Sequence, residues 1–89
     1  MSKPYRELRL SKDSVVREFS CDVTDRELEW HMDRRRRVVE VLEGRGWRLQ
    51  LQEGLPFELI PGAVHSIPQE SWHRLLKGND QLKILIRES

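Results

Sequence analysis

Residues 61–74 read PGAVHSIPQESWHR, and the spacing within this stretch is the most informative in the chain. A Pro-Gly pair opens the stretch, and this pair is typical of a tight turn. A short segment with Val64 and Ile67 follows and ends at Pro68, and His73 lies five residues beyond that proline. The stretch therefore predicts a turn, a short segment after it, and a histidine at a defined distance.

Working outward from this stretch, apolar residues keep a period of two through most of the sequence. The clearest cases are residues 15–21, 28–33, 47–52 and 82–87. A period of two is typical of strands with one face on a core and the other toward solvent. In residues 15–21 the apolar face is interrupted by Arg17. The pattern predicts an all-β protein.

Turn-forming residues separate these segments at short, even intervals. They occupy residues 44–46, 53–56, 61–62 and 78–80. Many short strands joined by regular turns predict a sandwich or barrel, here of roughly eight or nine antiparallel strands. Only residues 22–29 resemble a helical turn, with position 24 or 25 as its cap.

The length of the chain limits the number of domains that it can form. Its 89 residues predict a single domain over residues 1–89. A domain of this size buries a modest share of its surface, so its core is thin and pairing with a second copy would help it. We therefore expect a homodimer.

Charge and cysteine content narrow the classes of partner and compartment. Sixteen basic residues balance fifteen acidic ones, for a net charge of +1. This balance argues against a nucleic-acid or membrane partner. Cys21 is the only cysteine, which fits a reducing compartment. Residues 1–10 have no apolar run, so we expect neither a signal peptide nor a membrane span, and a cytoplasmic location.

Two segments together resemble the cupin family. Residues 38–46 read VVEVLEGRG and look like the first cupin motif, in which a strand ends in V-L-E-G-x-G. Residues 61–74 look like the second motif, which runs from a Pro-Gly turn through Ile-Pro to a histidine. The resemblance is strongest over residues 29–87, and residues 1–28 fit as N-terminal strands. It implies a small cupin-type jelly-roll β-barrel.

The resemblance also implies a metal site. The family usually holds one metal through an H-x-H pair, a following glutamate, and a histidine of the second motif. These positions fall on His31, Asp33, Arg37 and His73, so this chain keeps two histidines and has one aspartate. His31 and Asp33 lie two apart, which places both on one face of a strand.

Two histidines and one carboxylate form the facial triad of non-haem Fe(II) oxygenases. The implied cofactor is one divalent transition metal (Fe, Mn, Ni or Zn), bound by His31, Asp33 and His73. If the chain is an enzyme, the resemblance points to a metal-dependent oxygenase- or isomerase-type cupin. No catalytic residue is assigned beyond these.

Two further residues are candidate contacts for a small-molecule ligand. Arg37 occupies the position of the missing glutamate. A guanidinium cannot bind a cation, but it can hold the carboxylate or phosphate of a small anionic ligand. Among the tryptophans, Trp72 is the best candidate for a role in the pocket or at an interface, because it is next to His73.

Two alternatives stay open from the sequence. Asp33 and Arg37 can pair with each other in a metal-free polar cluster, which makes the chain a non-enzymatic binding or structural module. The strand over residues 28–33 can also face the other way, with Trp30 and Met32 inward and His31 in solvent. A one-residue slip in register exchanges these two faces.

Residues 34–37 are four consecutive arginines. Such a run can bind phosphate groups of nucleic acid. No aromatic residues interleave with it, although single-strand binding usually adds stacking aromatics. A solvated turn at a strand edge, where clustered charge blocks edge-to-edge pairing, is the favoured interpretation.

Overall fold

The computed structural model describes residues 5–23 and 28–89. Within these residues the chain forms eight strands and no helix, which confirms the predicted all-β class. The strands are β1 (Tyr5–Arg9), β2 (Ser14–Phe19), β3 (Arg37–Glu43), β4 (Arg48–Leu51), β5 (Phe57–Glu58), β6 (Val64–Ile67), β7 (His73–Leu76) and β8 (Leu82–Glu88). No helix in this part of the chain is long and apolar enough to cross a membrane.

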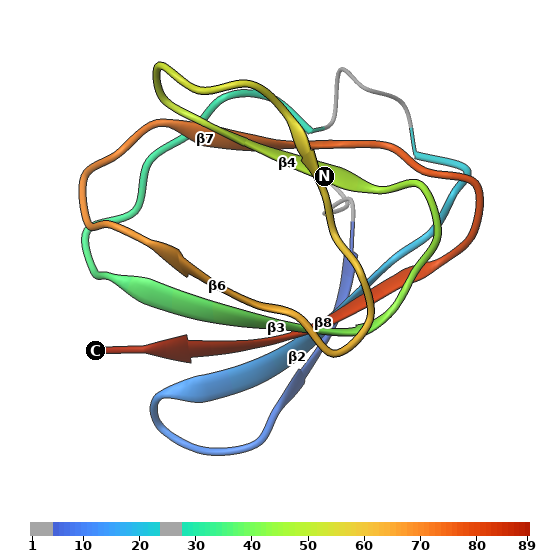
Figure 1. The fold of residues 1–89 in the computed structure, drawn as a ribbon. Coiled ribbons are helices and arrows are strands. Elements are labelled where there is room, and N and C mark those ends of the chain that lie inside the picture. The colour runs from blue at the N-terminus through green and yellow to red at the C-terminus, as the bar shows by residue number, and fades with distance from the viewer. Residues whose placement is uncertain (1–4, 24–27) are drawn as a thin grey trace.

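The strands form two antiparallel sheets that face each other (Figure 1). The larger sheet has the order β1-β2-β8-β3-β6, and the smaller has the order β5-β4-β7. Some strands adjacent in the large sheet are distant in sequence, since β8 lies between β2 and β3. The arrangement is a small jelly roll whose core lies between the sheets.

The period-two pattern decides which side chains fill that core. On β8, Leu82, Ile84 and Ile86 are buried, while Lys83 between them forms ion pairs with Glu18 and Glu43. The largest fully buried side chain is that of Trp47, just before β4. Its indole N–H donates a hydrogen bond of 2.6 Å to the carbonyl oxygen of Asp80, so the ring is buried without an unpaired donor.

The predicted turns are confirmed, and glycine is needed at two of them. Gly62, between β5 and β6, has a φ of 93°, a conformation that other residues adopt at a cost. Gly78, between β7 and β8, has no room for a Cβ atom, because one would collide with the backbone of Arg45 and Trp47. The turn at Gly78 therefore requires a residue without a side chain, and the turn at Gly62 favours one.

The predicted strand over residues 28–33 is reduced to a single bridge. The N–H of His31 donates to the carbonyl oxygen of His73 at 3.0 Å, and the N–H of His73 donates back at 2.9 Å. The side chains of Trp30, His31 and Met32 are all exposed, but His31 belongs to the described lining of the cavity and Trp30 and Met32 do not, so the chain adopts the orientation with His31 toward the cavity. Leu28 is buried and breaks the simple alternation. Residues 24–27, which include the predicted helix cap, lie outside the described residues.

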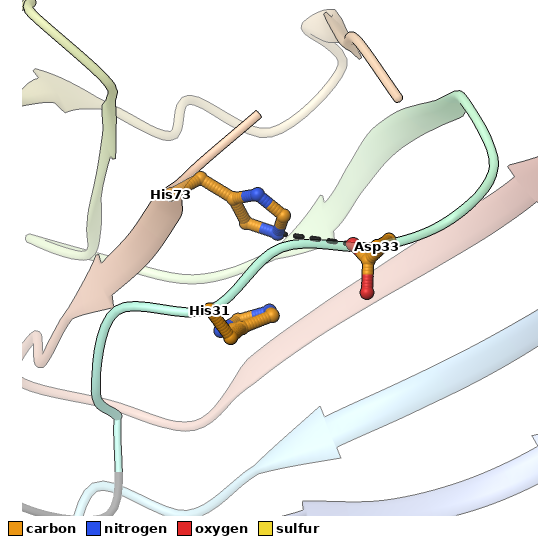
Figure 2. Close-up of side chains that lie close together, drawn as sticks. All are labelled: His31, Asp33 and His73. Carbon is orange, nitrogen blue, oxygen red and sulfur yellow. Dashed lines mark ion pairs between the residues drawn. The ribbon is translucent and has the colours of Figure 1, made fainter. Parts of the chain in front are cut away.

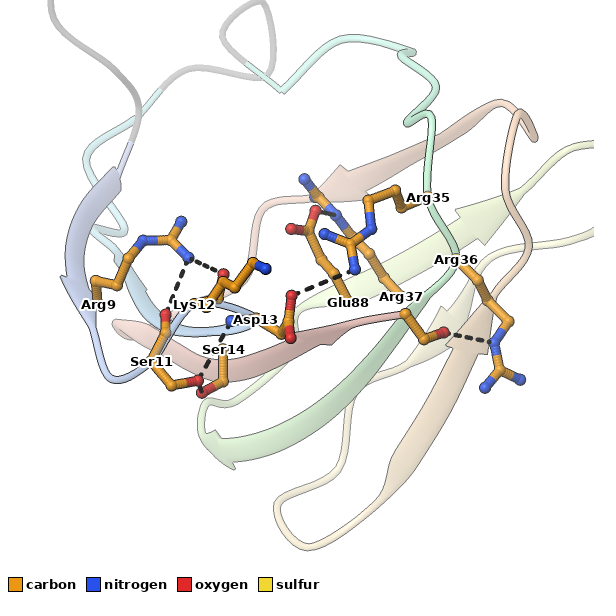
Figure 3. Close-up of polar contacts among 10 residues, drawn as sticks. Arg9, Ser11, Lys12, Asp13, Ser14, Arg35, Arg36, Arg37 and Glu88 are labelled. Carbon is orange, nitrogen blue, oxygen red and sulfur yellow. Dashed lines mark hydrogen bonds and ion pairs between the residues drawn. The ribbon is translucent and has the colours of Figure 1, made fainter.

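The arginine run divides into two parts. Arg34, Arg35 and Arg36 are exposed. Figure 3 shows Arg35 paired with Asp13 at 3.3 Å, and Arg36 donates to the hydroxyl oxygen of Ser89 at 3.3 Å. These contacts hold the segment against the β1–β2 turn and the C-terminal end. Arg37 differs from them, because it begins β3 and its side chain is mostly buried.

Candidate functional site

A cavity of about 310 Å³ lies between the two sheets. Both sheets contribute to its wall, which is mainly apolar. The apolar lining consists of Phe19, Leu28, Val39, Leu49, Leu59, Ile67, Leu75, Ile84 and Ile86. The polar and charged lining consists of Tyr5, Arg17, Glu29, His31, Asp33, Arg37 and His73. An apolar cavity with a few polar groups is the usual form of a small-molecule site.

The structure brings the three predicted metal ligands together. His31 and Asp33 lie on the segment before β3, and His73 begins β7 (Figure 2). One ligand atom from each residue lies within 4.8 Å of the other two. The backbone bridge between His31 and His73 joins the two segments directly, so the positions of the two imidazoles are coupled.

Both imidazoles are held by the same kind of hydrogen bond. Nδ1 of His31 lies 3.1 Å from the carbonyl oxygen of Glu29, and Nδ1 of His73 lies 3.0 Å from that of Ser71. A carbonyl oxygen only accepts, so each Nδ1 carries the hydrogen and each neutral ring keeps a lone pair on Nε2. Metal-binding histidines are usually oriented by such a second hydrogen bond.

The carboxylate of Asp33 lies between a histidine and an arginine. Its Oδ2 is 3.2 Å from Nε2 of His73 and 3.2 Å from Nη1 of Arg37. Oδ2 is nevertheless buried without a hydrogen bond among the described residues, because neither nitrogen approaches it in hydrogen-bond geometry. The contact with Arg37 is an ion pair, the contact with a neutral His73 is not, and a lone pair of Oδ2 stays available.

Burial lowers the pKa of His73 below its usual range, and the hydrogen bond to Ser71 only partly offsets this effect. A neutral His73 presents the lone pair of Nε2 toward the lone pairs of Asp33. Acceptor atoms that face one another repel unless a cation lies between or beside them. The donor set of two imidazoles and one carboxylate therefore fits a divalent transition metal.

Arg37 has two acidic partners of its own. Its Nε donates a hydrogen bond of 3.2 Å to Glu88, which lies opposite it in the β3–β8 register, and its Nη1 contacts Asp33. A ligand acid at Arg37 would have to compete with both carboxylates. The assignment of Arg37 as a ligand contact stays a prediction, and the Asp33–Arg37 pair of the metal-free alternative is present.

Trp72 lies apart from the other predicted site residues. Its side chain is 45% exposed and is absent from the described lining of the cavity. The reason is the strand pattern: His73 faces inward, so its neighbour faces outward. A contact between Trp72 and a ligand in the cavity has no support from this placement.

Arg17 is a cavity residue that the sequence analysis did not assign to the site. It lies on the inward face of β2, between the buried Val15 and Phe19. The signal was present in the sequence as the interruption of an apolar strand face. A charged residue at such a position faces either a partner or a cavity, and only the fold reveals which.

No family model matches the sequence, and no curated protein matches it either. Solved structures do match. A cupin domain from Bordetella pertussis Tohama I superposes with a TM-score of 0.63 over 100% of this chain and 98% of its own, at 17% sequence identity. The chain has the cupin fold. This confirms the fold implied by the resemblance of the two motifs.

Larger proteins with the cupin fold match as well. The DMSP lyase DddQ from Ruegeria pomeroyi DSS-3 has a TM-score of 0.75 and 15% identity over 88% of this chain and 39% of its own. FeII HppE has a TM-score of 0.70 and 16% identity over 100% of this chain and 58% of its own. The chain spans about two fifths of the length of the DMSP lyases that it matches. Identities this low establish the fold alone.

Proposed function

We propose that this cupin-fold chain binds one divalent transition metal through His31, Asp33 and His73, and acts on a small molecule bound beside that metal in the cavity. The observation that carries the proposal is the convergence of one potential ligand atom from each of three residues within 4.8 Å, with both imidazoles oriented by backbone carbonyls. Such an arrangement costs free energy unless a cation offsets the repulsion.

Three protein ligands leave further coordination positions for water and substrate, as catalytic metal sites require. A bound metal would supply Lewis-acid or redox chemistry at those positions. The residues of the chain perform the remaining tasks. Ser71 and Glu29 fix the imidazoles through their carbonyl oxygens, and the apolar wall excludes bulk water from the ligand.

The comparisons support the proposal without deciding it. HppE is named as an FeII protein, and DddQ is named as a lyase of the small molecule DMSP. Both use the fold that this chain has. Their activities belong to those proteins, and the proposal here is limited to a metal-dependent reaction of a small molecule.

Metal content tests the proposal directly. Protein purified without chelator should carry a divalent transition metal near one per chain by elemental analysis. Chelator-treated protein should melt at higher temperature after addition of Fe(II), Mn(II), Ni(II) or Zn(II), because a ligand at 100 times its Kd stabilises the folded state by about 2.7 kcal/mol. Absence of metal together with no rise in Tm for any of the four ions would refute the proposal.

A second candidate function has one observation in its favour. Arg37 already supplies a positive charge to Asp33, at 3.2 Å, so the cluster is partly neutralised without metal. In that case the domain is a metal-free binding or structural module. The two candidates separate in the metal titration, since a metal-free module shows no saturable binding of the four ions.

We also propose that the chain forms a homodimer through the outward face of the large sheet. One row of paired residues crosses all five strands of this sheet: Leu8, Val16, Leu85, Glu40 and Val64. All but Glu40 are apolar, and Leu8 and Val64 at the two ends are the most exposed.

The charges beside this row favour a second copy as the partner. Lys83 lies between Glu18 and Glu43 on the same face, so both signs are present and like copies do not repel. Sedimentation velocity should show a dimer for the wild type and a monomer for Leu8→Glu/Val64→Glu. A wild type that stays monomeric at high concentration would contradict this proposal.

A further inference from the structure

Arg17 lies on the inward face of β2, where it lines the cavity and is mostly shielded from solvent. Its neighbours on the same face of β2, Val15 and Phe19, are both buried, and the Arg17 side chain is only 16% exposed. It lies opposite Ile84 in the β2–β8 register, and both residues line the cavity. A charged side chain on such a face needs a partner, and among the described residues Arg17 has one acidic partner, Glu7.

The local contacts of Arg17 position its guanidinium but engage only part of its N–H donors. Its Nε donates to Glu7 at 3.1 Å, and its Cζ lies 4.2 Å above the ring of Tyr5. Within residues 5–23 and 28–89, this is the only hydrogen bond of the Arg17 side chain. A guanidinium carries further N–H donors in a planar fork that matches a carboxylate. The donors on Nη1 and Nη2 are therefore available to a ligand in the cavity.

The distance to the metal site gives the ligand its length. Arg17 is opposite Ile84, whereas Arg37, beside Asp33, is opposite Glu88. Ile84 and Glu88 are four residues apart on β8, roughly 13 Å at the rise of a strand. This separation of the backbone positions limits the length of a ligand that reaches both ends of the cavity. Ile86, an apolar lining residue, lies between them.

We propose that Arg17 binds the carboxylate of the natural ligand, which is a small organic acid with an apolar carbon segment and a second oxygen function at its far end. The apolar segment lies along Ile84 and Ile86, and the second oxygen function faces His31, Asp33 and His73. The placement of that second group rests on the proposed metal site. The anchoring of the carboxylate at Arg17 does not need the metal and can be tested without it.

The test uses a series of straight-chain monocarboxylates from butanoate to octanoate, with the matching alcohols as neutral probes. Binding to chelator-treated protein is measured by titration calorimetry and by ¹⁵N NMR shifts. The wild type should bind at least one acid in preference to its alcohol. Arg17→Met, which keeps a long apolar stem, should weaken that binding about 10- to 100-fold, as expected for loss of a charge-assisted hydrogen bond.

Two variants control this measurement. Arg87→Met removes an arginine that is outward on β8 and paired with Glu40, and it should leave acid binding unchanged. Glu7→Gln removes the carboxylate that holds Nε of Arg17, so acid binding should become several-fold tighter. If Arg17 served only to bind Glu7, the Glu7→Gln variant would bind acids no more tightly than the wild type.

The outcomes separate this inference from the proposed metal site. Equal acid binding by wild type and Arg17→Met, or no binding of any acid in the series, overturns the role of Arg17 even if metal binds. Acid binding that depends on Arg17 in a protein that takes up no metal supports the anchor and refutes the metal site. If Arg17→Met does not fold, the Nε–H resonance of Arg17 in the wild type decides: it should shift with acids and not with alcohols.

Discussion

The two arginines that face the cavity, Arg17 and Arg37, occupy similar sites but have different partners. Each lies on the inward face of a strand of the large sheet, and their side chains are 16% and 14% exposed. In the part of the chain that the structure describes, Arg37 contacts two carboxylates, those of Asp33 and Glu88, whereas Arg17 contacts one, that of Glu7. Burial alone therefore does not tell what a cavity arginine does.

The difference in partners indicates a difference in role. Because Arg37 is neutralised from two sides, it stabilises the carboxylates at the end of the cavity where we propose the metal. Arg17 keeps part of its donor capacity and stacks on Tyr5, which leaves it able to bind an acid at the other end. A substitution at one end of the cavity should therefore change binding at that end and leave binding at the other end unchanged.

The largest expected effect is on metal binding when Asp33 is replaced. Asp33→Ala should weaken binding of Zn(II) or Ni(II) by more than about 100-fold, because even residues behind the ligands usually account for 10–100-fold. Acid binding at Arg17 should not change. Asp13→Ala, which removes an exposed aspartate paired with Arg35, is the matched control. Calorimetric titration measures both affinities, and a variant that still binds metal tightly would show that the ligands are wrongly assigned.

The next effect is on folding. Arg37→Met leaves Asp33 and Glu88 without their cation and should lower the free energy of unfolding by about 2 kcal/mol, between the values for exposed and buried pairs. Arg17→Met removes one ion pair, that of Arg17 with Glu7, and should lower the free energy of unfolding by about 1 kcal/mol or less. Urea unfolding of metal-free protein measures both. Equal losses would mean that the two arginines are equivalent structural residues.

Arg37→Met should also tighten metal binding, by about tenfold, because a positive charge next to the ligand oxygen of Asp33 is removed. Arg17→Met should leave the affinity for metal within a factor of about two, since the two ends are separated by the apolar wall. The same titrations measure these values. Unchanged or weaker binding by Arg37→Met would indicate that Arg37 is needed to hold Asp33 in position.

The smallest effect is a pH dependence of the metal-free protein. Burial lowers the pKa of His73 in the folded state, below the value of about 6.5 expected in the unfolded chain. The unfolded state therefore binds more protons between these two pKa values. As the pH falls through this window, the free energy of unfolding should fall, at most by about 1.4 kcal/mol per pH unit from this group.

His73→Gln removes this pH dependence if His73 causes it, and His31→Gln should retain it. Urea unfolding between pH 5 and 8 provides the comparison. An identical pH profile for wild type and His73→Gln would assign the effect to another group.

Much of the fold follows from residues 38–46 and 61–74 together with the period of two. The turns at Gly62 and Gly78 lie where the sequence places them, and the buried faces of β2 and β8 follow the pattern. The spacing from Pro68 to His73 and between His31 and Asp33 predicted residues that the fold does bring together. The predicted strand over residues 28–33 did not form beyond its bridge at His31.

The sequence by itself determined which side chains share a face, because alternation along a strand follows from backbone geometry. It did not determine which face meets the cavity: motif spacing favours His31 inward, hydrophobicity favours Trp30 inward, and the bridge between His31 and His73 fixes the register. Nor could it pair Arg37 with Glu88, since these residues are 51 positions apart and meet only because β8 lies beside β3. The strand order of the large sheet thus gives Arg37 a second acidic partner, Glu88, whereas Arg17 has only Glu7 among the described residues, and this tertiary arrangement is why Arg17 is the proposed ligand anchor.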